Sequence, residues 1–311
     1  ALVLNNLFLT TACATVFIGT LYPLALEVVT GDKISVGAPF FNLTFGPLFV
    51  PLMIAVPFGP MLAWKRGDLY GAAQRLMAAG VAALLALAIV WAWTRGGSAL
   101  APLAIALSVF VIAGALSDLA ERVQLFRMPF RVSLRRAGGL PRSAWGSAFA
   151  HAGVGVALMG IVCETTWNSE HIAAMKPGDS AKIAGYDVQF DRLREQQGPN
   201  YRELVASFKV GLDGADLGVM TPSKRNFTTR GTSTTEAALK SRGASQLYIS
   251  LGETTPDGGI TVRIYHKPLV LLIWFGPVLM ALGGLLSLSD RRLRVGAPKP
   301  AKALSGLQAA E

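Results

Sequence analysis

The chain has 311 residues, of which 52% are hydrophobic and only 15% are charged, and its formal net charge is +10. Soluble domains carry about 25% charged residues, so this composition excludes an ordinary soluble protein and indicates a membrane protein with one soluble insert. The basic residues border apolar segments, so we expect them to mark membrane topology, and we predict no nucleic-acid partner.

Six apolar stretches of about 20 residues predict six transmembrane helices. The second stretch contains four prolines, which predicts a broken helix. The chain starts inside the first stretch, without a basic segment or a small-residue cleavage site. We therefore expect no signal peptide there, and we expect the chain to be part of a longer polytopic protein. The six stretches lie approximately at 4–26, 45–64, 75–94, 98–117, 144–163 and 268–288.

Basic residues in the loops predict the orientation, because cytoplasmic loops carry an excess of lysine and arginine. The short loops on one side, 27–44 and 95–97, hold only Lys33 and Arg95. We predict that the other side is cytoplasmic, with loops at 65–75 and 118–143 and a tail at 290–311. The arginines of 122–142 are a topology signal first, and anionic membrane lipid is a further possible partner. The basic residues of the cytoplasmic side are Lys65, Arg66, Arg75, Arg122, Arg127, Arg131, Arg135, Arg136, Arg142, Arg291, Arg292, Arg294, Lys299 and Lys302.

Residues 164–267 are predicted to form a small all-β domain in the periplasm. Alternating or β-branched runs occur in AKIAGYDVQF, YRELVASFKVGL, SQLYISLGE and GGITVRIY, and GPN, DGAD and PDGG are turn signals. TTEAALKSRG (234–243) predicts one or two helical turns instead. The fold class is therefore a polytopic α-helical membrane protein, with helices in 1–163 and 268–289 and a small β sandwich or barrel before the last helix.

His151 lies inside the fifth apolar stretch, about 10 Å of helix rise from its nearer end. A ligating or ionisable side chain at this depth is costly, which makes it a functional candidate. Ala148 and Gly155 on the same helical face leave room for a flat macrocycle, and imidazole is a common axial ligand to haem iron. A histidine that packs against a neighbouring helix fits the same pattern, so the residues alone leave both interpretations open.

The other two histidines, His171 and His266, lie at the two membrane borders of the β domain. Each could approach a ligand at the outer surface, but we favour an exposed polar residue at the membrane edge for His171 and an interfacial anchor for His266. Tryptophans near the outer ends of spans fit an aromatic belt, or a platform on which haem stacks. These tryptophans are Trp91, Trp93, Trp167 and Trp274.

The two cysteines, Cys13 and Cys163, belong to no C-x-x-C or C-x-x-C-H motif, which excludes a covalent c-type haem on this chain and a zinc cluster. We expect both to be buried small hydrophobic side chains. The sequence also has no Walker loop, no G-x-G-x-x-G that opens a helix after a strand, and no G-x-S-x-G. Nothing therefore supports an ATPase, a dehydrogenase or a serine hydrolase.

Several stretches, in order along nearly the whole chain, resemble the C-terminal part of the CcmF/CycK family. The matching stretches are LNNLFLTTACATVFIGTLYPL (4–24), GDKISVGAPFFN (31–42), MKPGDSAKIAGY (175–186), GPNY (198–201), TTEAAL (234–239) and VRIYHKPLVLLIWFGPVLMALGGLLSLSDRR (262–292).

This resemblance implies part of a haem lyase for c-type cytochromes in the bacterial inner membrane. The resemblance also implies that the chain takes part in accepting haem from the haem chaperone CcmE. With CcmH and CcmI, members of the family attach this haem to apocytochrome c. The family also holds a b-type haem in the membrane between two histidines, one of which precedes the periplasmic domain. His151 occupies that place, so the resemblance implies that His151 is an axial ligand to the iron of haem b.

The family's tryptophan-rich WWD signature, its two outer-surface histidines and its other transmembrane histidine have no match here, so we predict no catalytic residue in this chain. The alternative function is a non-catalytic membrane scaffold that docks apocytochrome or partner subunits. A transporter would fit the broken second span, but no paired charges line the predicted spans.

Overall fold

The computed structural model describes residues 2–62, 67–95, 99–229, 231–256 and 258–290. The described residues form two compact units, one within 1–78, 113–152 and 278–311, the other within 79–112 and 153–277. Lys65, Arg66, the predicted span ends at 63–64 and 98, and the predicted tail from 291 onward lie outside the described residues.

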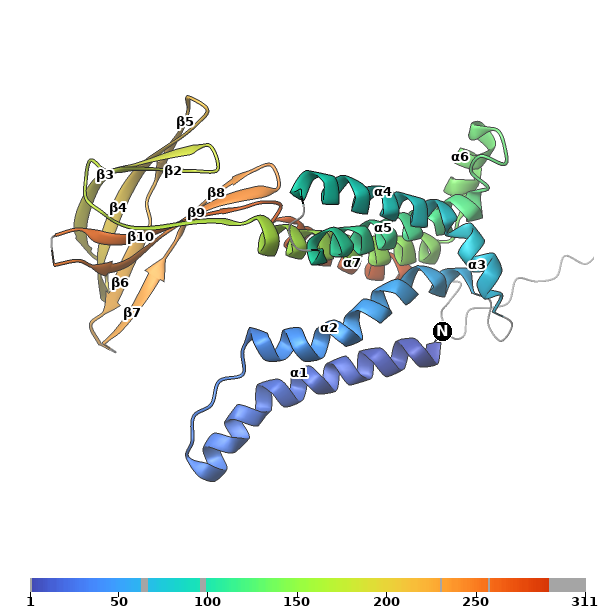
Figure 1. The fold of residues 1–311 in the computed structure, drawn as a ribbon, viewed down its shortest axis with the longest axis horizontal. Coiled ribbons are helices and arrows are strands. Elements are labelled where there is room, and N and C mark those ends of the chain that lie inside the picture. Colours follow the sequence, from blue (N-terminus) through green and yellow to red (C-terminus); the bar gives the residue numbers. More distant parts are fainter. Residues whose placement is uncertain (1, 63–66, 96–98, 230, 257, 291–311) are drawn as a thin grey trace, which may run out of the picture. The chain divides into compact units, whose positions relative to one another are not determined.

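Helices α1 (Leu2–Thr30) and α2 (Ala38–Ala55) lie side by side in the first unit (Figure 1). They approach closely at Gly19, where a β-carbon would lie 2.7 Å from the ring of Phe40. The 3-10 helix η1 (Val56–Met61) continues α2 and contains Pro57 and Pro60. Proline removes a backbone donor and crowds the preceding turn, which fits the change from α to 3-10 geometry at Val56. The other two prolines of the predicted break, Pro47 and Pro51, lie inside α2, which continues through them. A short helix, α3 (Leu69–Arg75), follows.

Four further helices have residues in both units. They are α4 (Met77–Thr94), α5 (Leu100–Val123), α7 (Arg142–Trp167) and α8 (Leu272–Leu288). Helix α6 (Phe130–Gly139) lies in the first unit. There the carboxylate of Asp290, just after α8, accepts hydrogen bonds from the backbone and the hydroxyl of Ser143, at 3.1 and 2.9 Å. These bonds satisfy donors in the first turn of α7, where a helix has no partners of its own.

Within the described residues, five helical segments are long and apolar enough to cross a membrane, and they confirm the predicted polytopic class. They are Val3–Thr30, Ala38–Met61, Met77–Thr94, Leu100–Val123 and Arg142–Trp167. The sixth predicted span is the shorter apolar helix α8, of 17 residues. It begins four residues later than predicted, after a turn in which Leu269 has a left-handed backbone conformation (φ 52°). The third predicted span is interrupted at Leu76, which separates α3 from α4.

The β domain is a sandwich of two antiparallel sheets (Figure 1). One sheet has the order β1-β10-β9-β8, and the other has the order β2-β3-β4-β6-β7, with β5 also paired to β4. The ten strands are β1 (Ser169–Met175), β2 (Ser180–Ile183), β3 (Tyr186–Gln197), β4 (Tyr201–Leu212), β5 (Ala215–Met220), β6 (Ser223–Phe227), β7 (Thr232–Glu236), β8 (Ala238–Arg242), β9 (Ser245–Thr254) and β10 (Ile260–Lys267).

The two sheets share one apolar core. Phe190 in β3 and Phe208 in β4 stack at 4.7 Å between ring centroids, and Ile264 in β10 belongs to the same buried cluster. The four predicted β segments all form strands, because their alternating side chains cover this core. The DGAD signal forms the β4–β5 turn, where Asp213 and Gly214 both have positive φ.

The prediction of helical turns at 234–243 is wrong. This segment forms the end of β7 and all of β8, and Ala237 between them carries the chain from one sheet to the other. The β-branched threonines of β7 pair with β6, and Leu239 pairs with Tyr248 of β9. Pairing on both sides of Ala237 outweighs the helix propensity of the local Ala-Ala-Leu-Lys sequence.

Candidate functional site

Helix α7, which carries His151, packs against α8 through glycines. In the first unit, a β-carbon on Gly283 would lie 2.6 Å from the carbonyl oxygen of Gly146. In the second unit, a β-carbon on Gly276 would lie 2.6 Å from the carbonyl oxygen of Gly153, and one on Gly160 would lie 2.7 Å from a backbone nitrogen of α8. Small residues let membrane helices approach to backbone contact. This face of α7 is therefore used for packing.

His151 lies on another face of α7, with Ala148 one turn before it and Gly155 one turn after it. Gly155 packs against α5, where its β-carbon would lie 2.6 Å from the side chain of Ile112. The hydroxyl of Ser108 donates a 2.6 Å hydrogen bond to the Gly155 carbonyl oxygen. Gly155 therefore serves helix contact, and the room that we predicted beside it for a macrocycle is filled by α5.

The imidazole of His151 is half-buried. It forms no hydrogen bond within the described chain, and no ring nitrogen is enclosed without a partner. Its unpaired nitrogens therefore reach the surface, where a ligand from outside the chain can approach. One exposed imidazole nitrogen fits one axial position of haem iron. The chain's two other histidines lie in strands, and the described residues contain no cluster of three His, Cys, Asp or Glu side chains.

A charged pair near His151 was missed by the sequence analysis. Asp118 in α5 is only 5% exposed, and Arg122 donates from Nε to both of its carboxylate oxygens, at 3.0 and 2.9 Å. Asp118 on α5 and His151 on α7 belong to the same compact unit. Paired charges therefore do line a span, contrary to our prediction. The reason is that α5 extends six residues beyond the predicted apolar stretch at 98–117. The Asp-x-x-x-Arg spacing was the available signal.

The structure brings His171 and His266 to one face of the β1–β10 pair. His171 is opposite Ile264 and His266 is opposite Ser169, so both side chains lie on the core side of these strands. The His266 ring lies 5.8 Å from the ring of Tyr186, and burial lowers the pKa of His266. Neither histidine belongs to a helix, so neither shares the environment of His151.

The end of α7 is tied to the β domain within the second unit. Lys267, the last residue of β10, donates to the carboxylate of Glu164 at 3.0 Å. Trp93 of α4 contacts Trp167 of α7, with 5.3 Å between ring centroids. Trp167 and Leu269 pack on a small apolar cluster that includes Cys163. These contacts fix the strands to the helix ends.

The two cysteines differ from each other. Cys163 is buried as predicted, whereas Cys13 is exposed, so the prediction of a buried Cys13 is wrong. Among the described residues, none covers the side chain of Cys13 on α1.

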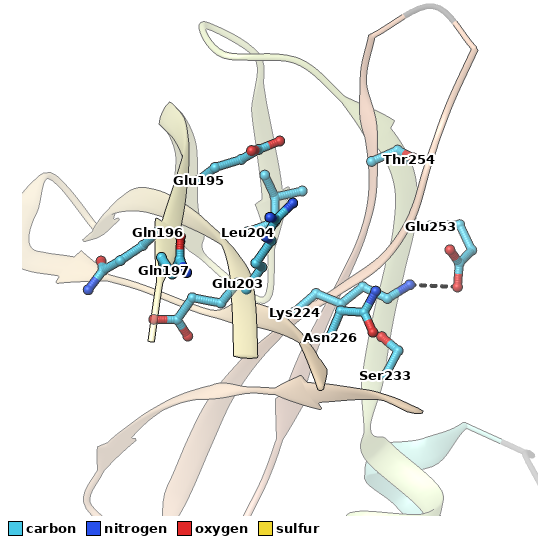
Figure 2. Close-up of a pocket in the computed structure, with 11 residues that line it drawn as sticks. Glu195, Gln196, Gln197, Glu203, Leu204, Lys224, Asn226, Ser233, Glu253 and Thr254 are labelled. Atoms are coloured by element: carbon cyan, nitrogen blue, oxygen red, sulfur yellow. Dashed lines mark hydrogen bonds and ion pairs between the residues drawn. The ribbon is translucent and has the colours of Figure 1, made fainter. Parts of the chain in front are cut away.

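The β domain also contains a polar cleft of about 730 Å³ (Figure 2). The long strands β3 and β4 meet β6 and β7 at its floor, and β9 supplies its rim. Lys224 donates to Glu253 across the rim at 2.6 Å, the contact dashed in Figure 2. No sequence motif marked this cleft, because its residues come from five strands. The lining residues are Glu195, Gln196, Gln197, Arg202, Glu203, Leu204, Lys224, Asn226, Ser233, Glu253 and Thr254.

Ionic contacts join the strands beside the cleft. Arg225 of β6 donates to Glu203 of β4 at 2.9 Å and lies 3.4 Å from Glu236 of β7. The hydroxyl of Ser223 also donates to Glu203, at 3.0 Å. The hydrogen bond from Arg225, more than that from Ser223, lowers the pKa of Glu203. This ion pair therefore links three strands of one sheet.

Comparisons with known proteins agree along the whole chain. The family model described as the CcmF C-terminal beta-sandwich matches residues 166–268. The cytochrome c-type biogenesis protein CycK of Bradyrhizobium diazoefficiens is 72% identical over 100% of this chain, and CycK of Rhizobium meliloti is 55% identical over 97%. CcmF of Pseudomonas aeruginosa is 36% identical over 94%. The matches cover 47%, 45% and 44% of these proteins, so the chain spans about half the length of the curated relatives it matches.

A solved structure of "Cytochrome c Heme Lyase CcmF" has the same fold over 92% of this chain and 45% of its own, with a TM-score of 0.69 and 23% identity. The multi-pass helices and the β sandwich therefore occur together in that protein, as they do here. The chain belongs to the CcmF family of cytochrome c-type biogenesis proteins and corresponds to its C-terminal part.

Proposed function

We propose that this chain is the part of a haem lyase for c-type cytochromes that supplies His151 as one axial ligand to a membrane b-type haem. The observation that carries the proposal is the His151 ring, half-buried in a membrane-spanning helix with unpaired nitrogens at the surface of the chain. The other two histidines of the chain lie in strands, so a second ligand to the iron would come from another part of the protein. When bound, the b-type haem supplies a one-electron couple that keeps the haem being attached in its ferrous form.

The chain's own residues hold the ligand in place. Glycine contacts with α8 fix the backbone of α7 on one side, and the hydrogen bond from Ser108 to Gly155 fixes it on another. A ligand on a rigid helix keeps its orientation when the iron changes charge. The Asp118–Arg122 pair carries opposite charges, so it brings little net charge near the site.

The resemblance to the family supports a place in the bacterial inner membrane with the β domain in the periplasm. There the substrates are haem, delivered by CcmE, and apocytochrome c, and the partner components are CcmH and CcmI. In this arrangement the β domain lies on the side where haem is attached, and the Lys267–Glu164 contact ties it to the ligand-bearing helix.

A second function, docking of a polypeptide by the β domain, is favoured by one observation. Strand β2 pairs with β3 only over residues 186–189, whereas β4 pairs with β3 along its whole length. Among the described strands, none covers the outer edge of β3 from residue 191 onward. This edge leads into the polar cleft, and an extended chain can add to a free strand edge by backbone hydrogen bonds. This function is the non-catalytic scaffold, and it is compatible with the first.

The test is the optical spectrum of the full-length protein purified from membranes. We expect a six-coordinate, low-spin b-type spectrum from the wild type, and lower haem content or a high-spin spectrum from His151→Ala, with less cytochrome c matured. His171→Ala removes an imidazole outside the spans and is the matched control, which should keep the wild-type spectrum. Normal haem content and a low-spin spectrum in His151→Ala would leave only the scaffold function.

A further inference from the structure

Helix α6 and the loop before it expose apolar side chains beside arginines. Phe126 is 94% exposed, Phe130 is 70% exposed and Leu134 is 63% exposed. The neighbouring Arg131 and Arg135 are also exposed. An exposed row of large apolar residues is unfavourable in water and indicates a covering surface.

The helical period sorts these residues onto separate faces. Phe130 and Leu134 are four residues apart and form one apolar stripe, and Arg131 and Arg135 form a basic stripe beside it. Arg136 lies further round the helix, beyond the packed face that carries Ser133. An apolar stripe with arginines beside it is the pattern of a helix that lies in a membrane interface.

A third face holds α6 to the rest of the first unit. Ser133 is 2% exposed, and its hydroxyl donates to the carbonyl oxygen of Gln124. The indole of Trp145 in α7 donates to the carbonyl oxygen of Ala137 at 3.2 Å. These contacts fix the rotation of the helix, so the apolar and basic stripes have defined directions.

We propose that α6 is an interfacial helix that binds the anionic headgroups of the bilayer. Phe130 and Leu134 insert at the boundary of headgroups and acyl chains, and Arg131 and Arg135 contact lipid phosphates. Arginine suits this role because its planar guanidinium donates two hydrogen bonds to one phosphate.

Connectivity and charge identify the lipid as the occupant. The helix before α6 ends at Val123 and the helix after it begins at Arg142, and both belong to membrane-spanning segments. Residues 140 and 141 alone join α6 to α7, so α6 lies close to the end of that span. One basic residue near an anionic surface strengthens binding to that surface by about fivefold, so Arg131 and Arg135 act together on negatively charged lipid.

The first experiment locates the apolar stripe. The full-length protein, with its other cysteines replaced, carries a bimane label at Leu134→Cys or at Arg135→Cys and is placed in nanodiscs containing phosphatidylglycerol. We expect the Leu134 label to be quenched by doxyl-labelled lipid and shielded from iodide, and the Arg135 label to be open to iodide. A Leu134 label open to iodide, or shielded from both quenchers as under another protein, would overturn the proposal.

The second experiment tests the charge and does not depend on the labels. The protein is purified in a mixture of phosphatidylglycerol and phosphatidylcholine, and the retained lipids are counted by native mass spectrometry. Arg131 and Arg135 are replaced together by glutamine, and the matched control replaces two exposed arginines of the β domain, Arg194 and Arg242. We expect the preference for phosphatidylglycerol to fall about tenfold or more in the first variant only. An equal preference in both variants would refute binding of anionic lipid by α6.

Discussion

Gly276 of α8 lies against the backbone of Gly153 in α7, so closely that a β-carbon at position 276 would be 2.6 Å from the Gly153 carbonyl oxygen. The same β-carbon would lie 2.6 Å from both the nitrogen and the β-carbon of Ala157. Two of these three atoms belong to backbone, which cannot move aside as a flexible side chain can. The two helices can therefore approach this closely because both have small residues at the contact.

The first prediction follows from this contact. Gly276→Ala should destabilise the protein by about 1–3 kcal/mol, because the added methyl forces the helices apart. Thermal unfolding of the purified protein, followed by size-exclusion chromatography after heating, measures this loss. Gly284→Ala in the same helix is the control, since a β-carbon there meets no atom within 4 Å. Equal melting temperatures for the two variants would mean that the α7–α8 contact is looser than described.

The helices and most of the strands were predictable because each leaves a recognisable pattern of apolar residues in the local sequence. A membrane span needs about 20 apolar residues whatever surrounds it, and the four predicted strand segments alternate because one face is buried. The helical prediction at 234–243 failed because no local signal shows that the chain changes sheets at Ala237. The interruption at Leu76 lies at the start of an apolar run, directly after Gln74 and Arg75, and has no proline to mark it.

The candidate site was predictable only in part. The apolar segment around His151 marked the residue, and family resemblance supplied its proposed partner, haem. Small residues alone could not tell which of them face a helix, and Gly155 proved to be covered by α5. The polar cleft could not be predicted, since strand pairing brings residues such as Gln197 and Asn226 together from distant positions.

The second prediction concerns acid stability of the β domain. Arg225 lowers the pKa of Glu203 in the folded domain, so the ion pair stabilises the fold above the unfolded pKa of about 4.3. The stabilisation is lost as pH falls from about 5 through the lower folded pKa, where Glu203 becomes protonated. Glu203→Gln should lower the free energy of unfolding by about 1 kcal/mol at pH 7. Between about pH 5 and the folded pKa, the free energy of unfolding of this variant should depend less on pH than that of the wild type. Urea unfolding of residues 166–268 between pH 3 and pH 7 measures it.

The control for this prediction is Glu195→Gln. Glu195 lines the same cleft but is exposed, and it forms no ion pair with any described residue. Its variant should follow the wild-type profile. A Glu203→Gln profile as steep as that of the wild type would show that other carboxylates control the acid transition.

The third prediction concerns membrane topology. The turn at Gly214 lies in the β domain, and Gly138 lies near the end of the arginine-rich helix α6. Because the two positions are separated by the single span α7, a periplasm-specific phosphatase fused after Gly214 should be active, and one fused after Gly138 should not. Activity at both positions would contradict the orientation derived from the basic residues.

The fourth prediction separates ligation by His151 from helix packing. His151→Gly removes the imidazole and leaves a space of its size next to the surface of the chain. If the imidazole binds iron, free imidazole added to the variant should enter this space and partly restore both the low-spin spectrum and the haem content. The titration is followed optically in the full-length protein, with His171→Gly as the control that should show no loss to restore. A packing histidine behaves differently, because its loss lowers the melting temperature and free imidazole does not restore a spectrum. Loss of haem that imidazole leaves unchanged, together with lower stability, would therefore identify His151 as a packing residue and remove it from the site.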